Sequence, residues 1–145
     1  MVRHYSCVIV LVVLLVGLPT AQAADTMLTL ACEGTKTETS RYGDDAERKR
    51  AISLSIIINF AARTVTGFPD VVGLVRPLIT DVSETTISFA GSSDPTATVS
   101  YSMSGTIDRV TGAVEGGYMS FPKEGYGRTW TTSYALKCRP AQRTF

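Results

Sequence analysis

Few residues in this chain could carry out catalytic chemistry. Its single histidine, His4, lies in an N-terminal segment that we expect to be removed on export. Without it, the mature chain can form neither a Ser-His-Asp site nor a Cys-His site. A zinc site would need both remaining cysteines, which are better assigned to a disulfide, together with carboxylates. We therefore expect no catalytic residue, no cofactor and no metal site.

Paired carboxylates are the remaining acid–base candidates. Asp81 with Glu84, or Glu115 with Glu124, could be brought together by folding, as in many glycoside hydrolases. Nothing in their spacing requires this, and charged residues are mostly exposed on protein surfaces. A carboxylate-based hydrolase is therefore kept as an alternative function.

The segment from Lys123 to Arg128 carries residue types that suit a binding surface. It places Lys123, Tyr126 and Arg128 close to Trp130. Tyrosine, arginine and tryptophan are enriched at binding hot spots, and binding residues concentrate on loops. We expect a possible interaction loop here. The alternative is an ordinary hairpin connection with Trp130 in the core.

The first 23 residues have the three parts of a secretory signal peptide. Arg3 gives a basic start, residues 7–18 form an apolar run, and residues 21–23 read Ala-Gln-Ala, a small-x-small cleavage site. The apolar run has 12 residues, whereas a membrane span needs about 20. We expect cleavage after residue 23, which leaves residues 24–145 as one exported domain with no stable membrane span.

Removal of the signal peptide changes both the charge and the cysteine count. Arg3 and Cys7 leave, so that 13 basic side chains balance 13 acidic ones and two cysteines remain. A neutral protein has no overall field that attracts nucleic acid, so we expect no nucleic-acid partner. Two distant cysteines in an exported domain predict one disulfide, between Cys32 and Cys138. Two free thiols are the alternative.

Alternation of apolar and polar residues predicts about eight short strands. In residues 129–138, for example, Trp130 and every second residue after it as far as Cys138 share one face. The expected strands are 26–33, 51–60, 64–68, 78–82, 85–90, 98–108, 113–121 and 129–138. Such spacing is typical of a small antiparallel barrel or sandwich, and we favour a meandering barrel. Its inward residues are mostly large, which predicts a packed core rather than a large cavity.

Several local signals refine this pattern. Residues 34–50 are polar throughout, so we expect a long loop or a short helical turn there, and residues 69–77 should be irregular. Leu78 and Val82 are expected to face inward. Asp108 and Gly112 predict a tight turn, in which the aspartate accepts a backbone N–H and the glycine takes positive φ. The glycine pair at 116–117 could allow a bulge.

The predicted disulfide conflicts with a simple meander. Cys32 and Cys138 both lie near the C-terminal ends of their expected strands, and those ends lie apart when the first and last strands pair antiparallel. Either the two strands run parallel, or the bond crosses between sheets, or the strands extend beyond their expected limits.

Three motifs carry a resemblance to known proteins. L-x-C-x-G at Leu30–Gly34, I-D-R-V-T-G at Ile107–Gly112 and Y-x-L-x-C-x-P at Tyr134–Pro140 occur in this order. The chain thus resembles a group of small uncharacterised exported proteins of Gram-negative bacteria. That resemblance implies export and the flanking cysteines, and it implies no activity. In architecture alone, the chain is also similar to the periplasmic lysozyme inhibitors, which are small β-barrels with a terminal disulfide.

These observations lead to one main expectation about function. We expect a non-enzymatic domain in the periplasm or outside the cell that binds a protein or an envelope component. The alternatives are a carrier of a small apolar ligand inside the barrel and the carboxylate-based hydrolase.

Overall fold

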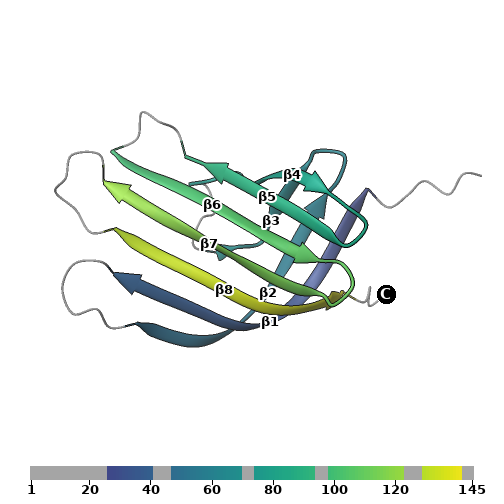
Figure 1. The fold of residues 1–145 in the computed structure, drawn as a ribbon, viewed down its shortest axis with the longest axis horizontal. Coiled ribbons are helices and arrows are strands. Elements are labelled where there is room, and N and C mark those ends of the chain that lie inside the picture. The colour runs from purple at the N-terminus through teal and green to yellow at the C-terminus, as the bar shows by residue number, and fades with distance from the viewer. Residues whose placement is uncertain (1–25, 41–46, 70–73, 94–97, 123–128, 142–145) are drawn as a thin grey trace, which may run out of the picture.

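The computed structural model describes residues 26–40, 47–69, 74–93, 98–122 and 129–141, which form a closed eight-stranded antiparallel barrel (Figure 1). The strands follow one another around the barrel, and β1 closes it by pairing with both β2 and β8. The strands are β1 (Met27–Ser40), β2 (Arg48–Asn59), β3 (Thr64–Thr66), β4 (Leu78–Val82), β5 (Thr86–Ser92), β6 (Val99–Asp108), β7 (Ala113–Pro122) and β8 (Trp130–Pro140). This arrangement confirms the expected all-β antiparallel fold as a meandering barrel.

The predicted signal peptide, residues 1–23, lies outside the described residues. Within the described ranges, no helix is long and apolar enough to cross a membrane.

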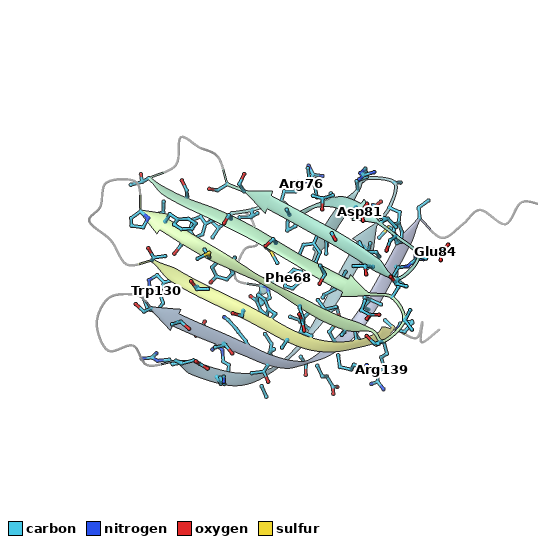
Figure 2. All side chains as sticks on the ribbon, viewed as in Figure 1. Phe68, Arg76, Asp81, Glu84, Trp130 and Arg139 are labelled. Atoms are coloured by element: carbon cyan, nitrogen blue, oxygen red, sulfur yellow. A yellow bond between two sulfur atoms is a disulfide. The ribbon has the colours of Figure 1, made fainter. Side chains whose placement is uncertain are left out.

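The two ends of the barrel differ in construction. At one end, which we call the turn end, short turns at 60–63, 83–85 and 109–112 join successive strands. At the opposite end, which we call the Trp130 end, β1, β5 and β7 finish and β2, β6 and β8 begin. Figure 2 shows Trp130 at one end of the molecule, with Glu84 and Arg139 at the other.

The core forms because successive residues of a strand point to opposite sides of the sheet. On β2, Ile56 and Ile58 are fully buried, and Ile52 and Leu54 pack against the core. On β8, the expected alternation holds from Thr132 to Cys138. The buried hydrophobic residues are Leu30, Cys32, Ile56, Ile58, Val65, Phe68, Val75, Ile79, Ile87, Phe89, Met103, Ile107, Val114, Tyr134, Leu136 and Cys138.

Three aromatic rings cross the middle of the barrel. Phe68 has its ring centroid 5.6 Å from that of Phe89 and 5.2 Å from that of Tyr134. The ring of Phe89 lies over Gly105, where a Cβ would come within 2.4 Å of it. An inward-facing glycine is therefore needed so that the large ring fits. These rings fill the centre of the barrel, in agreement with the expected packed core.

Phe68 does not belong to a strand, and it reaches the interior because of the residue before it. Gly67 has a φ of 116°, and a Cβ there would lie 1.9 Å from the carbonyl oxygen of Ser55. Only glycine combines this backbone conformation with such a close approach. The pairing of β3 with β4 is short, since the two strands share a single register pair, Thr64 with Leu78. Phe68 and Val75, which lie in the connection between these strands, are both buried in the core.

The disulfide between Cys32 and Cys138 is present and joins directly opposed residues of β1 and β8, with Cα atoms 4.0 Å apart. The third of the three possible explanations is therefore correct: the strands extend beyond their expected limits. β1 continues to Ser40 and β2 begins at Arg48. Residues 34–40 and 48–50 are thus strand, and the expected loop or helical turn was wrong for them.

Two further local predictions need correction, and one is confirmed. Leu78 and Val82 are 48% and 46% exposed. Leu78 faces outward because Ile79, which pairs with the buried Phe89, takes the inward position; after the register shift Val82 pairs with the inward Ile87 but stays exposed at the end of β4. The register is continuous through residues 116–117, without a bulge. The predicted turn after β6 is confirmed by its hydrogen bonds and by Gly112, which has a φ of 72°.

The disulfide generates a stability prediction. It closes a separation of 106 residues, for which the chain-entropy estimate is about 4–5 kcal/mol of stabilisation. We expect the double variant Cys32→Ala/Cys138→Ala to lose about that much free energy of unfolding, measured with guanidinium and circular dichroism. Titration of the unfolded, unreduced mature protein with a thiol reagent should find no free thiol. Two reactive thiols per chain would contradict the bond.

The turn after β6 generates a pH prediction. The carboxylate of Asp108 accepts the N–H groups of Thr111 and Val110, each at 2.8 Å. These hydrogen bonds hold the pKa of Asp108 below its ordinary value, and the bond from Thr111 has the larger effect. A carboxyl with a lowered folded-state pKa stabilises the fold above its unfolded pKa, and this contribution is lost as the pH falls through the folded value.

We therefore expect the stability advantage of the native protein over Asp108→Asn to be constant near neutral pH and to shrink in acid, below about pH 4. Thermal unfolding of both proteins between neutral pH and about pH 2 measures it. An advantage that stays the same across this range would show that the charge of Asp108 contributes nothing.

Candidate functional site

Polar side chains occupy the inside of the barrel at the Trp130 end. Lys36, Glu38 and Ser40 follow one another on the inward face of β1, and β8 places Tyr134, Thr132 and Trp130 opposite them. Lys36 is only 1% exposed, and Ser40, Ser120 and Thr132 are also buried. The interior is therefore apolar from the turn end to the three aromatic rings, and beyond them polar groups lie beside Met103, Tyr101 and Tyr118.

An ion pair organises this polar region. The ammonium of Lys36 lies 2.7 Å from Oε1 of Glu38. The same oxygen lies 3.2 Å from the guanidinium of Arg50, which reaches it from β2. The exposed fractions rise from 1% for Lys36 to 29% for Glu38 and 61% for Arg50. The carboxylate of Glu38 thus links a buried cation to one at the surface.

The position of Lys36 depends on the aromatic rings beneath it. Its partner in the register is Tyr134, whose ring contacts Phe68. Rings that pack against each other leave the lysine little room to move toward the turn end. This arrangement suits a fixed electrostatic support more than a reactive group.

Trp130 is exposed at the rim of this region. It stands at an inward position of β8, between Ser40 on β1 and Ser120 on β7, yet it is 46% exposed because it lies where the barrel opens. Its backbone N–H donates to Oγ of Ser120 at 3.2 Å, which fixes the start of β8. The alternative of Trp130 in the core was therefore wrong. The other residues of the expected interaction loop, Lys123, Tyr126 and Arg128, lie outside the described residues.

Two other large apolar side chains are exposed near Trp130. Phe121 is 42% exposed and Met119 is 38% exposed. Both lie on the outward face of β7, on either side of Ser120, which pairs with Trp130. Single exposed hydrophobic residues are ordinary. Met27, Val82 and Val110 are likewise exposed at the turn end, so the feature particular to the Trp130 end is the tryptophan itself.

The carboxylates considered for catalysis are exposed wherever the structure describes them. Asp81 and Glu84 are both exposed, on the hairpin between β4 and β5 (Figure 2). Glu115 is exposed on the outer face of β7, and Glu124 lies outside the described residues. No group of three or more histidine, cysteine, aspartate or glutamate side chains able to hold a metal occurs among the residues with described positions.

Sequence reasoning missed the pair of Lys36 and Glu38. The signal was present, since the two residues continue the parity of Leu30 and Cys32. A search for alternating apolar residues does not find a strand whose inward side chains become charged.

Comparison of the chain with protein-family models, curated proteins and solved structures finds no match. The site described above therefore rests on the chemistry and positions of its own residues.

The buried ion pair generates a prediction about stability. We expect Glu38→Gln to lower the free energy of unfolding by about 3 kcal/mol, because it removes the countercharge of a buried ammonium. The double variant Lys36→Met/Glu38→Gln should recover much of this loss, since both charges are then absent. Urea unfolding of the three proteins at neutral pH measures the effect.

A surface ion pair on β2 supplies the matched control. Lys49 and Glu47 are also 2.7 Å apart, but both are well exposed. Glu47→Gln should therefore cost less than about 1 kcal/mol. If Glu38→Gln costs no more than Glu47→Gln, burial does not strengthen the dependence of Lys36 on Glu38.

Proposed function

We propose that this protein is a non-enzymatic binding domain of the periplasm or the extracellular space that recognises a protein or envelope component with the Trp130 end of its barrel. The observation that carries the proposal is the exposure of Trp130, the single tryptophan of the chain, at a rim position. Tryptophan is among the residues most enriched at binding hot spots. A folded protein that leaves it half exposed offers an apolar contact group at the rim, and Phe121 and Met119 are exposed on the outer face of the neighbouring strand β7.

The surroundings of Trp130 support this role. The backbone of Trp130 is held between β1 and β7 by strand pairing, and the contact of Glu38 with Arg50 links β1 to β2. A binding surface on a rigid scaffold loses little conformational entropy when a partner docks. The rings of Phe68, Phe89 and Tyr134 fill the centre of the barrel, which favours an external binding surface over the carrier alternative.

The disulfide supports the compartment. Disulfides form and persist in oxidising environments outside the cytoplasm, and the bond between Cys32 and Cys138 fits such an environment. The N-terminal segment that we expect to be a signal peptide would direct the export of the chain to such a compartment. The periplasm and the extracellular space are both consistent with this chemistry.

The proposal predicts that Trp130→Ala abolishes partner capture without unfolding the barrel. Immobilised mature protein is exposed to periplasmic extract and solubilised envelope, and the retained components are identified by native mass spectrometry. We expect the native protein to retain a specific component and Trp130→Ala to retain at least about tenfold less, the usual scale of a hot spot.

Val110→Ala is the matched control. Val110 is 76% exposed and lies in the turn after β6, at the opposite end of the barrel. It should retain the same component as the native protein. Equal retention by the native protein and Trp130→Ala would refute the role of this end, and a tightly held small apolar molecule inside the barrel would favour the carrier.

A further inference from the structure

A shallow groove runs along the outer face of the barrel over β7. It has a volume of about 400 Å³ and is lined by outward residues of β6, β7 and β8. The groove exists because Gly117 has no side chain at a position where both neighbouring strands carry one. Ser104 on β6 and Ser133 on β8 are its register partners and form the two banks at this point.

The banks of the groove carry hydroxyl groups. Ser102 and Ser104 stand on one side, and Thr131 and Ser133 on the other. Within the described part of the chain, no hydrogen bond engages these four hydroxyls. Each can both donate and accept a hydrogen bond, so the two banks offer donors and acceptors to one ligand lying between them.

The floor of the groove is apolar from Gly117 to the exposed side chain of Met119, and Glu115 stands at its other end on the same face of β7. The exposed Phe121 follows Met119 on that face, just beyond the lining. Residues on one face of a strand recur about every 6.6 Å, so the distance from Gly117 to Phe121 is about 13 Å. The ligand that fits is flat and elongated, with apolar faces and polar edges.

The structure excludes two other kinds of extended ligand at this groove. A peptide could not join the sheet as an extra strand, because β6, β7 and β8 are each paired on both sides. A polyanion would find no cation in the lining and would meet the carboxylate of Glu115 instead. A neutral ligand with many hydroxyl groups matches both the charge and the hydrogen-bonding capacity of the groove.

From these features we infer that the groove binds a neutral glycan chain. A pyranose ring has two apolar C–H faces and a hydroxyl-bearing edge. Its faces would pack on Gly117, Met119 and Phe121, and its hydroxyls would bond to the serine and threonine banks. The groove also adjoins the Trp130 rim, since Thr131 follows Trp130 directly and pairs with Met119. The inference rests on the proposed binding function and specifies the envelope component as carbohydrate.

Isothermal titration calorimetry with two neutral β1,4-linked probes tests this inference, an oligomer of N-acetylglucosamine and one of glucose. We expect the native protein to bind at least one of them. Ser133→Tyr should weaken this binding at least about tenfold, because the tyrosine ring, which strands accommodate well, fills the groove. Ser104→Tyr does the same from the opposite bank and guards against a folding defect in one variant.

Ser53→Tyr is the matched control. Ser53 is exposed on the outer face of β2, away from the groove, and its substitution should leave binding unchanged. Circular dichroism and thermal unfolding verify that all variants are folded. The inference is overturned if the native protein binds neither probe. It is also overturned if Ser133→Tyr and Ser104→Tyr both bind the probe as tightly as the native protein does.

The outcomes also separate this inference from the proposed function. If the native protein binds neither oligosaccharide but captures an envelope component that Trp130→Ala does not retain, only the glycan groove is refuted. If the captured component is a protein and Ser133→Tyr retains as much of it as the native protein does, the glycan groove is again refuted and the proposed binding function stands. If nothing is retained in either experiment, both proposals fail.

Discussion

The closure of the barrel through β1 is the constraint on which the rest of the structure depends. β1 pairs over its length with β2 on one side and with β8 on the other, and the disulfide fixes the second pairing at one register. A shift of one residue would turn every side chain of β8 to the opposite face. Lys36 would then no longer lie opposite Tyr134, and Trp130 would leave the rim. The covalent bond thus protects the register that builds the polar end.

The interior of the closed barrel is filled with side chains of two kinds, apolar and polar. Near the turn end and in the centre, aliphatic and aromatic side chains pack around Phe68. Toward the Trp130 end, Glu38 supplies the countercharge that makes a buried lysine tolerable. This change from apolar to polar runs toward the rim at which Trp130 is half exposed.

The same change explains how far sequence reasoning could go. Apolar alternation predicted the strands with apolar inward faces, turn-residue chemistry predicted the turn at Asp108, and the cysteine count of an exported domain predicted the disulfide. Alternation stopped short on β1, because residues beyond Gly34 keep the period but lose the hydrophobicity. It also misplaced Leu78, since the register shift in β4 puts Leu78 and Val82 on different faces although they share one parity. The exposure of Trp130 depends on where the barrel ends, and local periodicity carries no information about that.

The final strand unites the two proposed surfaces through its alternation. Inward residues of β8 run from Trp130 at the rim to Cys138 at the disulfide, while Thr131 and Ser133 face outward and form one bank of the groove. A ligand that contacts Trp130 is therefore one residue away from hydroxyls on the outer face. Because both sets of residues belong to one strand held by eleven register pairs to β1, their relative positions are fixed before any ligand arrives. Trp130 pairs with Ser120, which lies between Met119 and Phe121 on β7, so one extended glycan chain that crossed the rim could use both surfaces, whereas a protein partner confined to the rim would use only one.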